Sequence, residues 1–275
     1  MFPEGIGHMR FKPDISRYTY PEKPDQHMLY VKRQVKTNFD ENYRYYNNTK
    51  RYHVLRFFVN IIIHIILYPF MYFRYGVKIE GKENVKEAKK IKTTVMTICN
   101  HVFPMDYLVI AQALRPKLQY FMAWPINFEG PNRHFIRVMG GVPIPEKLKA
   151  IKSFEKAIDD IVMDNHWLHV YPEGSMWYYY PNIRPLKKGC FKTAYKHNLP
   201  VLPMAISFRP RKGIFKLYNK KEPLVTLRVG KLMYVNNELE KHDAIFDIQS
   251  RANHELQILA GITPNDPDYQ TIERK

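Results

Sequence analysis

A run without charge lies near the N-terminus, and it requires burial in protein or contact with lipid. Residues 57–73 read FFVNIIIHIILYPFMYF, and no Asp, Glu, Lys or Arg occurs between Arg56 and Arg74. This length is at the lower limit for a helix that spans a bilayer. Basic residues flank the run on both sides, whereas a spanning segment usually carries them mainly on one side.

A helix over this run would carry a polar stripe along one face. The stripe consists of Arg56, Asn60, His64 and Tyr68. Because a spacing of four places side chains on the same face of a helix, the opposite face is almost wholly apolar. We therefore expect a helix that lies in the membrane interface or dips partway into it, with the stripe toward the lipid headgroups or the body of the protein. The alternative is a buried core helix whose few polar groups find partners inside the protein.

The composition indicates an anionic partner. Lys and Arg outnumber Asp and Glu by 43 to 26, which gives a net charge of +17. A surplus of this size is typical of proteins that bind nucleic acid, a membrane surface or a phosphorylated substrate. Cys99 and Cys190 form no CxxC pair, which fits a reducing compartment. The N-terminus lacks the pattern of a secretory signal, and we expect membrane association at the cytoplasmic face.

Segments with strand and helix patterns alternate along the rest of the chain. Short β-branched and apolar segments predict strands, and apolar residues three or four positions apart predict helices. The alternation indicates an α/β fold, a single domain with a mostly parallel sheet flanked by helices. The expected strands lie within 75–90, 93–99, 118–124, 166–174, 199–208 and 223–230, and the expected helices within 105–114, 132–140, 147–163, 187–198 and 241–260.

Two polar motifs follow expected strands. Asn100, His101 and Asp106 come after the strand at 93–99, and the sequence YPEGS comes after the strand that begins near residue 166. The spacing of His101 and Asp106 does not suit one face of a helix. Pro104 disfavours a helix before it, so a turn can bring the two side chains together. Because loops after the carboxyl ends of parallel strands form the sites of such sheets, we expect both motifs at one site.

At this point the motifs resemble a known family. NHVFPMD at 100–106 resembles the NHxxxxD block of the glycerolipid acyltransferases, the family of 1-acylglycerol-3-phosphate acyltransferase. VYPEGSMW at 170–177 resembles the FPEGTR block of this family, and GGVPIP at 140–145 resembles a degraded form of the block between them. The basic segment that begins at Arg184 resembles the part that follows. The similarity covers roughly residues 76–235, and four blocks in the right order are more specific than any one alone.

The resemblance implies transfer of a fatty acyl group from an acyl thioester, acyl-CoA or acyl carrier protein, to the hydroxyl of a lysophospholipid. The first acceptor to expect is 1-acylglycerol-3-phosphate, which would give phosphatidate. His101 would be the general base, because its pKa range suits proton transfer near neutrality. Asp106 would orient the imidazole and stabilise its cationic form. The partners implied are membrane phospholipids, the acyl carrier and the lysophospholipid. We expect no cofactor, no metal and no nucleic acid.

The resemblance also implies substrate-binding residues. The acceptor pocket would include Asn100, Glu173, Gly174 and Ser175, and the headgroup phosphate would meet Arg184, Lys187 and Lys188. Simpler roles remain open. Asp106 is also suited to cap a helix, His101 to a structural place at a strand end, Glu173 to a surface salt bridge, and the basic group to a solvated face against lipid headgroups. A nucleophilic role for Cys99 is rejected, because Cys99 lies within an apolar strand.

The sequence departs from the family at two arginine positions. The FPEGTR block has Met176 in place of arginine, and the block at 140–145 continues into Glu146 and Lys147. Both arginines are thought to serve the acceptor phosphate in the family. Lys147 or the basic group at 184–188 would replace them, or the acceptor is a different lysophospholipid or another hydroxylated lipid. The segment MWYYY at 176–180 suits a pocket of stacked rings or a membrane-facing lip.

With the resemblance, the chain divides into four parts. These are a polar, Tyr-rich segment at 1–50, a membrane-associating helix at 51–75, an acyltransferase domain at 76–261 and a C-terminal tail at 262–275. The composition leaves two interpretations of the first part open, loose order or contact with a membrane surface. Three other functions compete with acyl transfer: non-catalytic binding of anionic lipid, nucleic-acid binding, which is suggested only by the charge, and hydrolysis with His101 activating water.

Overall fold

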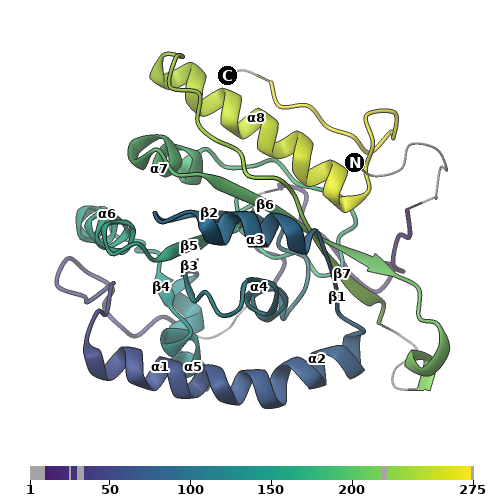
Figure 1. Cartoon of the computed structure of the whole chain (residues 1–275), viewed down its shortest axis with the longest axis horizontal. Coiled ribbons are helices and arrows are strands. Elements are labelled where there is room, and N and C mark those ends of the chain that lie inside the picture. Colours follow the sequence, from purple (N-terminus) through teal and green to yellow (C-terminus); the bar gives the residue numbers. More distant parts are fainter. Residues whose placement is uncertain (1–9, 25, 30–33, 218–221, 274–275) are drawn as a thin grey trace.

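The computed structural model describes residues 10–24, 26–29, 34–217 and 222–273 and is built around one sheet (Figure 1). The sheet has seven strands in the order β1-β7-β6-β2-β5-β3-β4. Neighbouring strands run parallel except β6 and β7. The mostly parallel α/β fold predicted above is thus confirmed. The strands are β1 (Lys78–Glu80), β2 (Met96–Cys99), β3 (Gln119–Ala123), β4 (Gly141–Pro143), β5 (Trp167–Val170), β6 (Val201–Arg209) and β7 (Leu224–Val229).

Helices cover both faces of the sheet, and the two faces have separate apolar clusters. Met96 and Ile98 of β2 pack with α6 (Leu148–Met163), α7 (Gly189–His197) and α8 (Lys241–Ala260). Val95 and Cys99 pack with α3 (Lys82–Lys90) and α4 (Asp106–Leu114). Alternate residues of β2 are therefore buried on opposite faces, which is why this strand is a continuous apolar run. α5 (Arg133–Val138) lies beyond the β3 side of the sheet.

The sequence patterns missed two elements. The segment 75–90 was predicted as a short strand and a turn, but it also contains helix α3, which buries Val85 and Ala88 among Lys and Glu residues. Few apolar residues are enough here, because one side of a short helix faces solvent. β4 has three residues and pairs only at the edge of the sheet, where Pro143 is tolerated.

A nearly continuous helical run lies along one side of the molecule (Figure 1). It consists of α1 (Lys50–Ile62), a π-helical turn (Ile63–Leu67) and α2 (Tyr68–Tyr75). Among the residues described, it is the one helix with the length and composition to cross a membrane. We call it the N-terminal helical run.

The polar stripe of this run faces the body of the protein. Arg56 is buried, donates to the carbonyl oxygens of Gln119 and Met139, and stacks on the Tyr120 ring with 4.6 Å between guanidinium carbon and ring centroid. Tyr68 is buried as well. The opposite, apolar face is exposed, so the alternative of a buried core helix does not hold. The stripe therefore packs against the body of the protein, which is one of the two orientations expected from the sequence.

The described part of the Tyr-rich N-terminal region packs on the domain. Tyr45 is 2% exposed, donates through its hydroxyl to the carbonyl oxygen of Phe39, and accepts a bond from Arg137 at its own carbonyl oxygen. Phe39 belongs to the apolar cluster that also holds α6. The interpretation of this region as loosely ordered is therefore wrong for these residues.

Candidate active site

The two polar motifs lie side by side at the same edge of the sheet. His101 follows β2 and Glu173 follows β5, and these strands are parallel neighbours with Ile98 opposite Val170. The backbone N–H of His101 donates to the Glu173 carboxylate over 3.0 Å. The expectation that both motifs meet at the carboxyl ends of the strands is therefore confirmed.

A turn between β2 and α4 brings His101 to Asp106. The backbone N–H of Asp106 donates to the carbonyl oxygen of Phe103 over 3.0 Å, which tightens the chain before the helix. His101 Nδ1 consequently lies in hydrogen-bond contact with Asp106 Oδ2. Asp106 is also the first residue of α4, but Met105 is the N-cap residue and no side chain caps this helix, so the simple capping role considered for Asp106 is not observed. Because Nδ1 is held by the carboxylate, Nε2 is the ring nitrogen left to act on a substrate proton.

Tyr171 supports this pair, and it was not among the residues predicted. Its ring stacks on His101 with centroids 3.9 Å apart and planes at 11°. Its hydroxyl donates to Asp106 Oδ1 over 2.7 Å, where the backbone N–H of Tyr107 also donates. Burial raises the pKa of Tyr171 well above its usual value, so the hydroxyl remains a donor. The available signal was the tyrosine at 171, where the FPEGTR block has phenylalanine.

A buried polar chain lies behind Tyr171. His169 Nδ1 and Thr97 Oγ1 are 2.8 Å apart, and the Thr97 hydroxyl donates to Gln119 Oε1 over 3.0 Å. Burial, with a smaller effect of the His101 charge, lowers the pKa of His169 to about 3. His169 is therefore neutral at physiological pH and donates from Nδ1 to Thr97.

Glu173 is buried and fully engaged by the backbone and by Arg184. Its carboxylate accepts from the N–H groups of His101 and Arg184 and from the Arg184 guanidinium over 2.8 Å. Arg184 also donates to Ser175 Oγ over 2.7 Å and stacks on Trp177. The surface salt bridge considered for Glu173 is excluded, because both side chains are buried. Since its guanidinium is enclosed, we propose that Arg184 holds the second motif in place and does not contact the headgroup.

The remaining predicted residues are Asn100, Gly174, Lys187 and Lys188. Asn100 is buried and bonds to the backbone N–H and carbonyl of Ile206, so it ties β2 to β6. Gly174 has φ +79°, and a Cβ there would lie 2.8 Å from Lys187 Nζ. The exposed ammonium of Lys187 therefore covers Gly174. Lys187 and Lys188 both line a different cavity, next to α8.

A cavity of about 430 Å³ opens at this edge of the sheet. His101, Asp106, Gly174 and Ser175 lie in its wall. His27 and Leu29 line it as well, although no sequence pattern connected the N-terminus to the site. Much of the remaining wall is apolar and comes from Phe121, Met122, Ala123, Trp124, Pro125, Ile144, Val170 and Met176.

Comparisons with known proteins agree with this geometry. Residues 76–207 match the acyltransferase family model, and this range includes both motifs. Residues 76–207 of the chain are therefore similar to the acyltransferase family. Over 152 residues it is 28% identical to an uncharacterized acyltransferase of Schizosaccharomyces pombe, which covers 52% of this chain and 53% of that protein. Over 155 residues it is 26% identical to the 1-acyl-sn-glycerol-3-phosphate acyltransferase of Saccharomyces cerevisiae, covering 50% and 47%.

The chain spans about half the length of these curated relatives. Among solved structures, the 1-acyl-sn-glycerophosphate acyltransferase of Thermotoga maritima covers 76% of this chain and 97% of its own, with 19% identity and a TM-score of 0.46.

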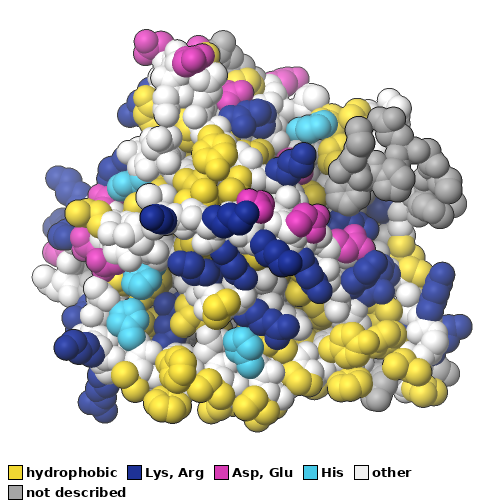
Figure 2. Space-filling view, in the orientation of Figure 1, with side chains coloured by type: hydrophobic (Ala, Val, Ile, Leu, Met, Phe, Trp, Pro, Cys, Tyr) yellow, Lys and Arg dark blue, Asp and Glu magenta, His cyan; other side chains and the backbone are white. Residues whose placement is uncertain are grey.

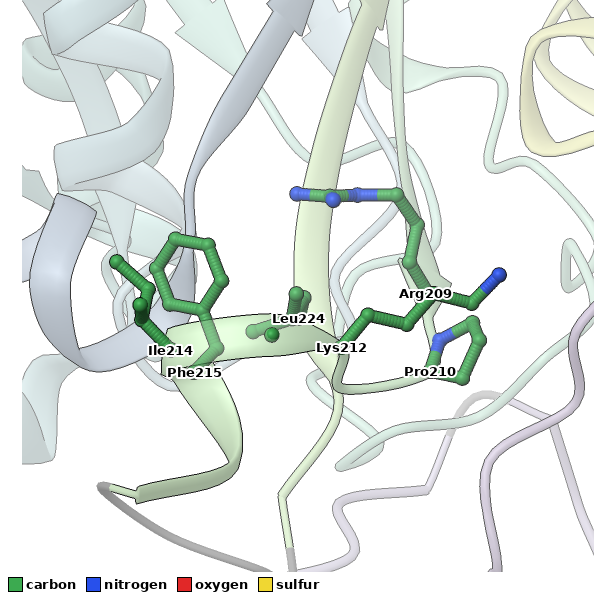
Figure 3. A pocket seen from close by; sticks show the side chains of 7 residues that line it. Arg209, Pro210, Lys212, Ile214, Phe215 and Leu224 are labelled. Carbon is green, nitrogen blue, oxygen red and sulfur yellow. The ribbon is translucent and has the colours of Figure 1, made fainter.

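Another large cavity has a different lining. It measures about 530 Å³ and lies beside the 3-10 helix η3 (Gly213–Leu217), where Ile214, Phe215 and Leu224 surround it (Figure 3). Arg209 also lines it, but its guanidinium donates to Thr226 Oγ1 and to the backbone. Among the described residues of this wall there is no histidine or carboxylate, in contrast to the wall of the cavity at His101.

The neutral buried histidine gives the fold a pH-dependent stability. An unfolded His169 takes up a proton below about pH 6.5, but the folded protein resists uptake until about pH 3. The unfolded state is therefore favoured as the pH falls through this window. From pH 7 to pH 5, His169 should lower the free energy of unfolding by about 2 kcal/mol. Urea unfolding at both pH values measures this, and the decrease should be smaller in His169→Gln. An equal decrease in both proteins would contradict it.

Proposed function

We propose that the protein transfers a fatty acyl group from an acyl thioester to the hydroxyl of a lysophospholipid. The first acceptor proposed is 1-acylglycerol-3-phosphate, which gives phosphatidate. One observation carries the proposal: the His101–Asp106 pair lies in the wall of a largely apolar cavity. The match of residues 76–207 to the acyltransferase family model supports it, and so does the similarity to the yeast enzyme.

The proposed reaction needs a base and no protein nucleophile, because the thioester is already activated. His101 Nε2 accepts the proton of the acceptor hydroxyl while its oxygen attacks the thioester carbonyl carbon. Asp106 stabilises the imidazolium that forms at His101. The tetrahedral intermediate then loses the thiolate, which takes the proton from His101. A C–O bond forms, a C–S bond breaks, and the products are an ester and a free thiol.

Tyr171 and Asp106 prepare His101 for this step. The Tyr171 ring restricts rotation of the imidazole, and its hydroxyl holds the Asp106 carboxylate from the far side. Because the imidazole does not have to reorient, little free energy is lost in reaching the transition state. The apolar part of the cavity wall suits the fatty acyl chain of a substrate.

We further propose that the N-terminal helical run rests in the membrane interface and does not cross the bilayer. Its first half is tied to the body at Arg56 and its second half at the fully buried Met71. A helix docked along its whole length lies parallel to the surface that it contacts. Figure 2 shows hydrophobic side chains gathered along this lower edge of the molecule. The exposed ones are Val54, Leu55, Phe57, Phe58, Ile61, Ile62, Ile65, Ile66, Phe70, Tyr72 and Phe73.

The triple variant Phe58→Glu/Ile62→Glu/Ile65→Glu tests the membrane face. Each of these side chains is more than half exposed, so the fold should survive the change. Insertion of one such side chain into lipid contributes about 1.5–3 kcal/mol, and the triple variant should bind phospholipid vesicles at least about a hundredfold more weakly. The control, Leu148→Glu/Met163→Glu, changes exposed apolar residues of α6 and should bind as the wild type does. Unchanged binding of the triple variant would refute the proposed face.

The substrates are tested with a panel in detergent or membranes. Labelled acyl-CoA and acyl carrier protein are the donors, and lysophospholipids with different headgroups are the acceptors. Transfer to lysophosphatidate supports phosphatidate formation, whereas transfer only to another acceptor identifies a changed specificity. Absence of transfer with either donor would leave the lipid-binding alternative, in which the basic and apolar surface is the whole function.

A further inference from the structure

The segment MWYYY at 176–180 is covered by the N-terminus of the chain. We call residues 10–24 and 26–29 the N-terminal strap. The Tyr20 ring stacks on Trp177 with centroids 5.4 Å apart, and its hydroxyl donates to the carbonyl oxygen of Tyr178 over 2.7 Å. Tyr18 stacks on Tyr179 with centroids 5.6 Å apart. The aromatic residues that follow the second motif therefore form a platform for the strap, which agrees with the predicted stacked rings.

Hydrogen bonds join the strap directly to the second motif. The carbonyl oxygen of Gln26 accepts from Ser175 Oγ over 3.1 Å and from Trp177 Nε1 over 2.9 Å. The carbonyl oxygen of Pro24 accepts from Arg184 Nη1 over 2.9 Å. Ser175 and Arg184 also bond to each other, so the strap and the Glu173–Arg184 ion pair belong to one hydrogen-bond network. The path of the strap is thus set next to the cavity.

This path places His27 in the wall of the cavity that is also lined by His101 and Asp106. The His27 ring stacks on Trp124, directly after β3, with centroids 4.1 Å apart and planes at 12°. Burial, followed by the charges of Lys187, His101 and Arg184, lowers the pKa of His27. His27 lines the cavity that holds His101, and the Lys187 ammonium lies beside Gly174 of its wall, so two donors lie near this cavity.

We propose that residues of the N-terminal strap form part of the wall of the substrate cavity and that His27, together with Lys187, binds a phosphate group of a substrate. This inference rests on the acyl transfer proposed above. Met176 occupies the position of the arginine in the FPEGTR block, so a phosphate at this cavity needs other donors. Charged donors bind phosphate oxygens through short, strong hydrogen bonds. A bound phosphate also favours the protonated form of a nearby imidazole, which adds a second positive charge beside Lys187.

Glu146 also lines the cavity, and it limits where the phosphate binds. Like charges repel, so the phosphate is expected at the His27 and Lys187 side of the opening. Lys147, the other candidate replacement for a family arginine, bonds to Asn38 over 2.7 Å, whereas the Lys187 ammonium lies beside Gly174 of the cavity wall. The positions of these residues therefore favour the strap over the segment at 145–147 as the phosphate-binding side.

Two sources can supply the phosphate, the headgroup of lysophosphatidate or the nucleotide part of acyl-CoA. His27→Ala is compared with wild type in steady-state kinetics along two series. The first uses lysophosphatidate or phosphate-free 1-acylglycerol as acceptor with one donor. The second uses acyl-CoA or the acyl thioester of pantetheine as donor with one acceptor. The control is His242→Ala, an exposed histidine on α8 outside the described wall of the cavity.

Loss of a hydrogen bond to a charged group should raise KM for the phosphate-bearing substrate about tenfold or more. KM for its phosphate-free counterpart should stay within about twofold, and the series that responds identifies the source. Tyr20→Ala, which loosens the strap without lining the cavity, should shift KM in the same direction. An equal KM in His27→Ala, or an equal rise with and without phosphate, would overturn the proposal.

Failure of the proposed function is distinguished by binding measurements with one substrate at a time, so that no acyl transfer takes place. The dissociation constants for lysophosphatidate and for acyl-CoA are measured by calorimetry in wild type and in His27→Ala. If wild type transfers no acyl group, acyl transfer is refuted, whereas a weaker phosphate-dependent binding in His27→Ala still supports the strap as a phosphate site. Equal binding by the two proteins overturns that site, whatever the turnover.

Discussion

His101→Ala is expected to lower kcat by about a hundredfold to ten-thousandfold, which is the usual contribution of a general base. The alanine removes the nitrogen that accepts the hydroxyl proton and leaves Asp106 without a group to orient. No other histidine of the described wall is paired with a carboxylate, since His27 stacks on Trp124. The remaining activity would come from binding alone. The measurement is kcat with labelled acyl thioester at saturating acceptor.

The fold should survive this change. The His101 side chain is 23% exposed, and Asp106 keeps its bonds from the Tyr171 hydroxyl and the Tyr107 backbone. Circular dichroism and vesicle binding of His101→Ala should therefore match wild type. Asp106→Asn should also reduce kcat, because the amide cannot stabilise the imidazolium. Wild-type activity in a folded His101→Ala protein would contradict the assignment of the base.

Arg184→Met is expected to lower the free energy of unfolding by about 3–5 kcal/mol, as is typical when one partner of a buried ion pair is removed. The side chains of Arg184 and Glu173 are 2% and 0% exposed. The variant leaves the Glu173 carboxylate buried with backbone donors only, and it also removes the bonds to Ser175 and to the strap at Pro24. Urea unfolding at pH 7 measures the change.

The matched control for this prediction is Arg251→Met. Arg251 pairs with Asp247 one turn away on α8, and both side chains are substantially exposed. A pair of this kind contributes at most about 1 kcal/mol. In Glu173→Gln/Arg184→Met the buried charge is absent, and part of the lost stability should return. A loss in Arg184→Met no greater than that in Arg251→Met would show that the buried pair does not hold the second motif.

Local sequence patterns were enough to predict most of the fold and the centre of the candidate site. Apolar strands such as 93–99 and the periodic helix at 147–163 were predictable, because burial dictates both periodicities. The meeting of His101 and Asp106 was predictable as well, because the turn at Pro104 lies between them in the sequence. A short edge strand such as β4 has too few residues for a pattern to form.

The surroundings of the pair were not predictable, because they depend on contacts between distant segments. Tyr171 reaches Asp106 from another strand, and His27 reaches the cavity only because Tyr20 and its neighbours dock on 176–180. Arg184 was grouped with Lys187 by charge, yet one is enclosed by Glu173 and the other is exposed. Residue type alone does not distinguish a buried ionic support from an exposed phosphate donor.

The most direct test of acyl transfer at His101 is product analysis with a labelled acyl thioester and lysophosphatidate, with wild type and His101→Ala side by side in membranes. The label is followed into diacyl phospholipid and into free fatty acid, with and without acceptor. We predict that wild type forms labelled phosphatidate only when acceptor is present and that His101→Ala forms almost none. Label in free fatty acid regardless of acceptor, or equal phosphatidate formation by both proteins, would contradict the proposed function.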